Sequence, residues 1–135
     1  MRSYGYSGVQ VSALGPVDPA NIARLAENYE LEIAATHFGW NYFVTDIERL
    51  IDIHQIWDCR HAAIPSLPED YRNEIGIDRF ATQLTSIADR LNSVNIDFSY
   101  HNHSHELTRI GSSTWLSKLY SELPASLLKA ELDVY

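Results

Sequence analysis

Hydrophobic and polar residues follow two different periods along the chain, and the changes between them predict strands and helices in succession. Apolar residues at every second position favour strands at 8–13, 31–37, 96–103 and 127–135. A denser apolar run favours a further strand at 57–64. Apolar residues three and four positions apart predict intervening helices near 19–29, 46–54, 78–92 and 115–123. The pattern is typical of an α/β protein with five strands and four helices.

The first predicted helix has a clear start signal. Asp18 suits the N-cap position and Pro19 suits the first helical position. The apolar residues that follow recur at helical spacing, and we expect one buried stripe formed by Ile22, Leu25, Ala26 and Tyr29.

The alternation of strands with helices indicates parallel βαβ crossovers, and two architectures are compatible with it. One is an open, doubly wound sheet, and the other is a (β/α)8 TIM barrel, which typically needs about 250 residues and would be only partly present. Two predicted strands carry polar residues at alternate positions: Asp97, Ser99, His101 and His103 in one, and Lys129, Glu131 and Asp133 in the other. An open sheet covered by helices on both faces favours apolar runs, so these polar sets favour a partial TIM barrel.

Composition narrows the classes of partner. The 135 residues are 45% hydrophobic, as expected for one globular domain, and the formal net charge of -8 argues against a nucleic-acid surface. The single cysteine, Cys59, forms no internal disulfide and favours a reducing compartment. Without a secretory leader pattern or an apolar run of about eighteen residues, the sequence predicts a cytoplasmic protein with no membrane partner.

Half of the six histidines are crowded into one short stretch, where His101, His103 and His105 are followed by Glu106. Period-two alternation places His101 and His103 on one face of the predicted strand. Histidine is the commonest metal ligand and titrates near neutral pH. The stretch therefore predicts a metal site or a proton-transfer site.

Two further polar residues, His37 and Asp133, fall at the carboxyl ends of predicted strands, where parallel α/β folds bind their ligands. Nitrogen and carboxylate donors together suit a divalent metal such as Mn, Zn, Co or Mg better than Ca. Such a metal acts as a Lewis acid on the carbonyl and adjacent hydroxyl of a sugar or polyol, so that a carboxylate or histidine can remove the neighbouring C–H proton. The same arrangement supports isomerisation, epimerisation or loss of water.

These expectations assign roles to six residues. His101 and Asp133 are expected to bind the metal, and His103 and Glu106 to act in catalysis. His37 and Trp40 are expected to contact the substrate. A solvated loop position for Glu106, a structural role for His37 and a hydrophobic plug at Trp40 remain alternatives, while solvent or packing roles are favoured for His54, His61 and His105, and a core position for Cys59.

The chain resembles the xylose-isomerase-like sugar phosphate isomerase/epimerase family of metal-dependent TIM barrels. The residues that carry the resemblance are Gly5-Tyr6-Ser7-Gly8-Val9, the strand ending in His37, Ile64-Pro65 with Leu67-Pro68-Glu69-Asp70-Tyr71-Arg72, Tyr100-His101-Asn102-His103 with Glu106, and Glu131-Leu132-Asp133-Val134-Tyr135.

The resemblance implies that residues 1–135 form one partial barrel domain, corresponding to the second through sixth strands and lacking the first, seventh and eighth. Asp133 matches the family's sixth-strand metal ligand. The fifth-strand ligand, often Glu in relatives, falls near His101, with Glu106 as the alternative donor. The implied activity is isomerisation or epimerisation of a sugar or sugar phosphate through an enediolate. A dehydratase acting on a keto-inositol or keto-sugar, a non-catalytic carbohydrate-binding module and a metal-dependent endonuclease are the alternatives.

Overall fold

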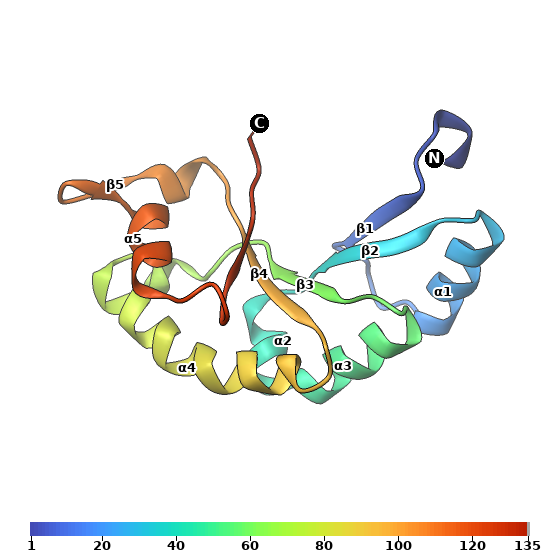
Figure 1. The fold of residues 1–135 in the computed structure, drawn as a ribbon, viewed down its shortest axis with the longest axis horizontal. Coiled ribbons are helices and arrows are strands. Elements are labelled where there is room, and N and C mark those ends of the chain that lie inside the picture. The colour runs from blue at the N-terminus through green and yellow to red at the C-terminus, as the bar shows by residue number, and fades with distance from the viewer. Residues whose placement is uncertain (135) are drawn as a thin grey trace.

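The computed structural model describes residues 1–134, which contain a five-stranded parallel sheet (Figure 1). Its strands lie in the order β1-β2-β3-β4-β7, and each pairs in parallel with its neighbour. Their bounds are Gly8–Ser12 for β1, Glu32–His37 for β2, His61–Ile64 for β3, Asp97–His101 for β4 and Lys129–Glu131 for β7.

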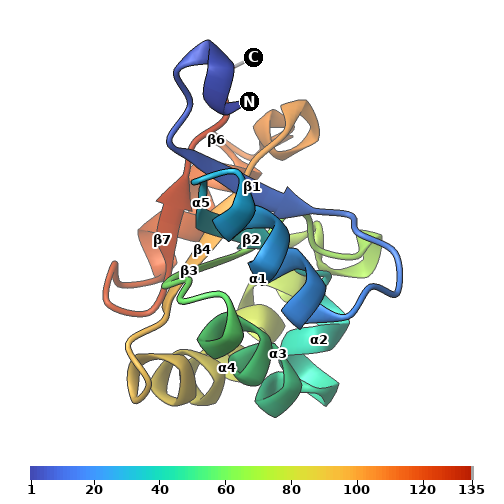
Figure 2. The same cartoon turned by 90° about the vertical axis from the view of Figure 1, so that its right-hand side faces the viewer.

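Helices connect these strands and lie along one side of the sheet (Figures 1 and 2). Their bounds are Pro19–Asn28 for α1, Trp40–Thr45 for α2, Ile47–Ile56 for α3, Glu74–Asn92 for α4 and Trp115–Glu122 for α5. Short 3-10 helices occupy Arg2–Tyr4, Glu69–Tyr71 and Ser104–Leu107, and a small hairpin joins β5 (Arg109–Ile110) to β6 (Ser113–Thr114).

The hydrophobic core lies between the sheet and these helices. Phe98 and Tyr100 of β4 are buried there against residues such as Leu84 of α4 and Leu119 of α5. His101 lies at the end of the same strand and is half-buried. The predicted two-faced character of β4 is therefore confirmed, with apolar side chains toward the helices.

The sheet curves strongly enough to bring its two edge strands within hydrogen-bonding distance. Gln10 of β1 donates from Nε2 to Glu131 Oε1 of β7 over 2.7 Å. Four strand spacings of about 4.8 Å would separate these edges by roughly 19 Å in a flat sheet. Strands closed toward one another in this way form the wall of a barrel, so the prediction of a partial TIM barrel is confirmed over an open sheet.

The start of α1 is confirmed, but its packing differs from the prediction. Asp18 caps the helix by accepting a hydrogen bond from Ala20 N, with Pro19 at the first helical position. The expected stripe is not buried, because Leu25 and Tyr29 are 53% and 61% exposed. Since α1 follows the edge strand β1, one side of the helix lacks a neighbouring element among the described residues.

Several predicted boundaries are wrong. The third strand begins at His61, since α3 continues to Ile56 and a left-handed residue, Asp58, separates the two elements. Helix α4 begins one turn before the predicted start, where Asn73 accepts from Gly76 N. The β5–β6 hairpin near residue 110 was not among the predicted elements. The last strand contains three residues, and Tyr135 lies outside the described residues.

Within residues 1–134, the helices are either too short or too polar to cross a bilayer.

Candidate metal centre at the strand ends

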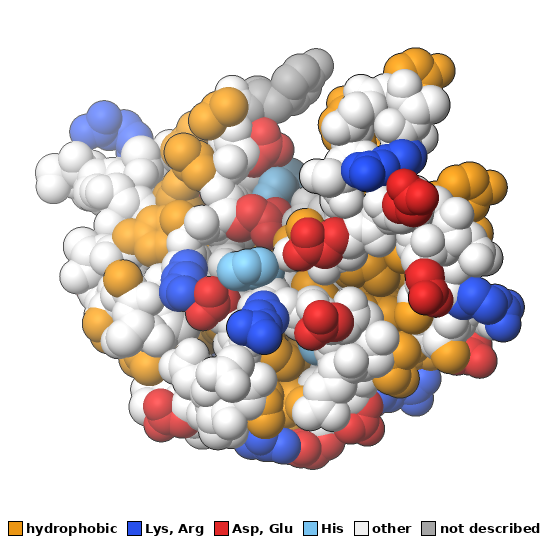
Figure 3. All heavy atoms as spheres, turned by 45° about the vertical axis from the view of Figure 1, so that its right-hand side comes forward, with side chains coloured by type: hydrophobic (Ala, Val, Ile, Leu, Met, Phe, Trp, Pro, Cys, Tyr) orange, Lys and Arg blue, Asp and Glu red, His pale blue; other side chains and the backbone are white. Residues whose placement is uncertain are grey.

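Three potential metal ligands meet at the carboxyl ends of three strands. His37 ends β2, His101 ends β4 and Glu131 ends β7. Glu131 Oε1 lies 2.6 Å from His37 Nε2 and 3.1 Å from His101 Nδ1, and the two imidazole rings are 4.6 Å apart. Figure 3 shows histidine side chains between acidic side chains in a hollow of this face. The topology thus assembles the cluster from residues up to 94 positions apart.

One oxygen of Glu131 accepts three hydrogen bonds, from Gln10, His37 and His101. Burial alone raises the pKa of this carboxyl, but the hydrogen bonds from Gln10 and His37 and the electrostatic influence of His37 and His101 outweigh burial. The pKa of Glu131 is therefore lowered. The side chain is an anion at neutral pH, with the charge that a metal ligand needs.

His101 lies between two carboxylates. Its Nδ1 donates to Glu131, because a carboxylate only accepts, and its Nε2 lies 3.7 Å from Asp133 Oδ2. A neutral imidazole would turn a lone pair toward the carboxylate of Asp133, which is repulsive. A cation on this side, either a second ring proton or a metal ion, removes the repulsion. His101 and Asp133, the two predicted metal ligands, thus lie side by side, and their role as ligands stays a prediction.

The cluster fits a divalent cation. Ligand atoms from His37, His101 and Glu131 all lie within 4.8 Å of one another. Two imidazole nitrogens and one carboxylate suit borderline ions such as Zn, Co or Mn. His37 Nδ1 lies 3.3 Å from Ser12 Oγ, a contact that fixes the ring orientation and leaves Nε2 directed at the cluster. His37 therefore lies among the potential ligands, whereas the sequence predicted a substrate contact.

Glu106, the predicted catalytic carboxylate, is part of the protein interior. It is 1% exposed, and Tyr100 Oη donates to its Oε1 over 2.7 Å. His103 N donates to Oε2 over 2.8 Å, and His105 Nε2 lies 2.8 Å from Oε1. Both oxygens are occupied, so the side chain holds the loop after β4 together and the predicted solvated loop position is wrong. Its predicted catalytic role receives no support from this geometry.

His103 and Glu106 form a reciprocal cap on the 3-10 helix Ser104–Leu107. A ring nitrogen of His103 accepts from the backbone N–H of Glu106, while Glu106 accepts from the backbone of His103. In the neutral imidazole the other ring nitrogen therefore carries the proton. His103 is exposed, and its ring lies 4.9 Å from that of His101. The free ring N–H can therefore donate a hydrogen bond.

Other predicted site residues occupy the core. Trp40 is 4% exposed and its ring contacts Phe43 and Phe80, which supports the hydrophobic-plug alternative. His54 is buried, donates from Nδ1 to Cys59 O and accepts from Thr36 Oγ1, and burial lowers its pKa. The packing alternative for His54 is confirmed.

Sequence reasoning missed two members of the cluster, Glu131 and Gln10. Glu131 was visible as the middle polar residue of the alternating set with Lys129 and Asp133, but Asp133 was chosen as the ligand. No local signal singles out Gln10. A shift of register between Val9 and Gln10 in the β1–β2 ladder marks its place in the strand.

Comparison with known proteins places this fold. No family model and no curated protein matches the sequence. A sugar phosphate isomerase/epimerase from Parabacteroides distasonis has a similar structure, with 18% sequence identity and a TM-score of 0.84 over 99% of this chain. An AP endonuclease of family 2 from Brucella melitensis gives 17% and 0.74 over 98%. A xylose isomerase domain containing protein from Salmonella typhimurium gives 14% and 0.66 over 97%.

These similarities establish the class of fold, a xylose isomerase-like TIM barrel present in part. The chain spans 60% of the length of the first two neighbours and 51% of the third. The resemblance found in the sequence is confirmed for the fold. The numbering of the strands as second to sixth of a barrel stays a prediction.

Proposed function

We propose that the full-length protein containing this chain is a metal-dependent isomerase or epimerase of a sugar or sugar phosphate. The observation that carries the proposal is the meeting of His37, His101 and Glu131 at one rim of a barrel wall. A structural neighbour with a TM-score of 0.84 is a sugar phosphate isomerase/epimerase, which supports this choice among barrel reactions.

In this proposal His37, His101 and Glu131 hold a divalent ion, and Asp133 offers a further oxygen 3.7 Å from His101. When bound, the ion would polarise a substrate carbonyl and so lower the pKa of the adjacent C–H group. Gln10 orients Glu131 through its 2.7 Å hydrogen bond. His103 presents a ring N–H beside His101, where it can donate a hydrogen bond to a substrate oxygen as negative charge develops.

Proton abstraction beside a carbonyl makes the proposal testable without knowing the sugar. Full-length protein loaded with Co or Zn is incubated in D2O with a panel of ketoses, aldoses and their phosphates, and NMR follows loss of the C–H signal. We expect deuterium incorporation with an isomeric product. Glu131→Ala is expected to abolish exchange, while Glu27→Ala, which removes an exposed carboxylate from α1, retains it.

Two outcomes of this experiment contradict the isomerase proposal. Wild-type rates in a folded Glu131→Ala protein would remove the cluster from the chemistry. Loss of water from a keto-sugar, with no isomeric product, would instead identify the dehydratase alternative.

An endonuclease is a second candidate, because one neighbour with a TM-score of 0.74 is an AP endonuclease. The formal net charge of -8 counts against it, since a duplex-binding surface requires concentrated positive charge. Cleavage of a DNA duplex containing an abasic site, measured with the same metal-loaded protein, separates this candidate from the first.

A further inference from the structure

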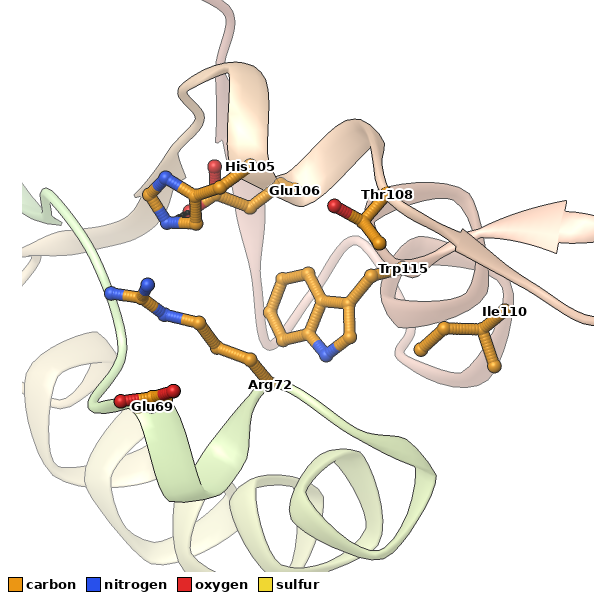
Figure 4. A pocket seen from close by; sticks show the side chains of 7 residues that line it. All are labelled: Glu69, Arg72, His105, Glu106, Thr108, Ile110 and Trp115. Atoms are coloured by element: carbon orange, nitrogen blue, oxygen red, sulfur yellow. Dashed lines mark ion pairs between the residues drawn. The ribbon is translucent and has the colours of Figure 1, made fainter.

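We propose that the pocket lined by Arg72, His105 and Trp115 binds an oxyanion group, a phosphate or carboxylate, of a small molecule. The pocket measures about 300 Å³ and lies between the segments that follow β3 and β4. Figure 4 shows its lining side chains: Glu69, Arg72, His105, Glu106, Thr108, Ile110 and Trp115. The inference concerns binding alone and does not rest on the proposed reaction.

Arg72 brings a positive charge that no carboxylate neutralises. Its Nε donates to Leu67 O over 3.0 Å and its Nη2 to Ser66 Oγ over 2.9 Å, which fixes the guanidinium plane. Within residues 1–134 no carboxylate oxygen lies within 4.0 Å of it, whereas Arg79 and Arg90 each form an ion pair of 2.6 Å. A guanidinium has five N–H donors in a fork that matches phosphate and carboxylate, and donors remain here for a ligand.

Trp115 forms part of the pocket wall, which makes it a reporter of occupancy. The side chain is 2% exposed and lines the pocket, and its Nε1 has no hydrogen-bond acceptor within the described part of the chain. A buried N–H without an acceptor is destabilising, and only a shift of the ring that opens Nε1 to the pocket would let a ligand oxygen accept from it. Figure 4 shows the six-membered ring of Trp115 toward the guanidinium of Arg72 and the indole nitrogen beside the aliphatic part of the Arg72 side chain. Trp115 N also donates to Thr108 O over 2.9 Å, which holds the Thr108 side chain at the same pocket.

The two carboxylates of the lining do not offset this donor set. Both oxygens of Glu106 already accept hydrogen bonds inside the protein, and His105 pairs with one of them. Glu69 is exposed, where solvent and salt screen its charge. The pocket thus presents the guanidinium of Arg72 and the hydroxyl of Thr108 as donors for an oxyanion.

The indole N–H of Trp115 reports directly on occupancy. In ¹⁵N-labelled full-length protein its NMR signal is assigned by its absence in Trp115→Phe. Inorganic phosphate and acetate are titrated separately at constant ionic strength, with chloride as the non-binding anion. We expect a saturable shift of this signal with phosphate, acetate or both, and the more tightly bound anion identifies the ligand group.

Arg72→Met is expected to weaken binding about tenfold to a hundredfold, the usual effect of losing a charge-assisted hydrogen bond. Arg72→Lys, which keeps the charge without the fork, should lie between. Arg24→Met removes the same charge from α1 and should bind as wild type. Thr108→Val, which leaves Arg72 in place, should weaken binding severalfold and serves if Arg72→Met does not fold. The proposal is overturned if neither anion shifts the signal, if chloride shifts it equally, or if folded Arg72→Met and Thr108→Val bind as tightly as wild type.

Discussion

Two clusters in this chain are each built from two imidazoles and one glutamate, and they differ in what surrounds the glutamate. The Glu131 side chain is 27% exposed and is held by side chains from three other strands. Glu106 is 1% exposed and accepts from the hydroxyl of Tyr100 in β4 and from the backbone N–H of His103 in its own loop. Equal composition therefore gives a potential ligand in one place and a structural cap in the other.

The difference extends to the neighbouring tyrosine. Burial, and then the hydrogen bond and the charge of Glu106, raise the pKa of Tyr100 well above its usual range. The hydroxyl therefore stays protonated and serves as a donor to Glu106 at any physiological pH. In the Glu131 cluster, by contrast, the surrounding donors keep the carboxylate charged and partly accessible.

The largest effect is expected from Glu131→Ala. Loss of the anionic donor should weaken binding of Zn or Co by at least about 100-fold, or about 2.7 kcal/mol, as measured by titration calorimetry on the full-length protein. Without metal the variant should remain folded, with a modest loss of stability because three hydrogen bonds to Glu131 are removed. Glu27→Ala is the matched control. Wild-type metal affinity in Glu131→Ala would contradict the assignment of Glu131 as a ligand.

Glu106→Ala should affect stability instead. It leaves the Tyr100 hydroxyl and the His103 backbone N–H without their acceptor, so the free energy of unfolding should fall by about 2 kcal/mol in urea denaturation. Metal affinity of the folded protein should stay near wild type. A drop in affinity as large as that of Glu131→Ala would show that Glu106 belongs to the metal centre after all.

A smaller effect is expected from Gln10→Ala. Outer hydrogen bonds to metal ligands commonly alter affinity tenfold or more, so we expect about tenfold weaker metal binding with nearly unchanged stability. Gln55→Ala, on the exposed surface of α3, is the control. Equal affinities in both variants would show that His37 and His101 suffice to orient Glu131.

The smallest expected effect is on the pH dependence of stability. Because the folded pKa of Glu131 is lowered, its stabilisation is present above the ordinary value near 4.5 and is lost as pH falls through the folded value. The free energies of unfolding of metal-free wild type and Glu131→Gln, followed against pH, should therefore differ by a constant amount above pH 4.5 and converge as the pH falls through the lower folded pKa. Parallel curves throughout would mean that the hydrogen bonds to Glu131 do not favour its charged form.

The alternation of apolar and polar residues in the strands, and the residues at which strands end, could be predicted because both depend on the local sequence pattern. Alternation in 97–101 separates Phe98 and Tyr100 from His101 correctly, and His37 and His101 do lie at one rim. Helix α2 was missed because its six residues, Trp-Asn-Tyr-Phe-Val-Thr, are aromatic, β-branched or otherwise weak helix formers. Packing of Trp40 and Phe43 against the core stabilises it instead.

The candidate site was only partly predictable. The crowding of histidines pointed to the correct rim, but the sequence could not show that Glu106 turns inward to close a cap, since histidine is not among the preferred N-cap residues. The choice between Glu131 and Asp133 depended on how far the sheet curls, a property of the packed fold. Gln10 entered the cluster for the same reason.

The hydrogen bond between Gln10 and Glu131 joins residues 121 positions apart, across the first and last strands of the sheet. The position of the carboxylate therefore depends on the fold of nearly the whole described chain. Fraying of the three-residue strand β7 would dismantle the centre while most of the core stayed intact. A cation bound there would hold the two edge strands of the sheet together. Metal binding would therefore report that the sheet has curved into a barrel wall.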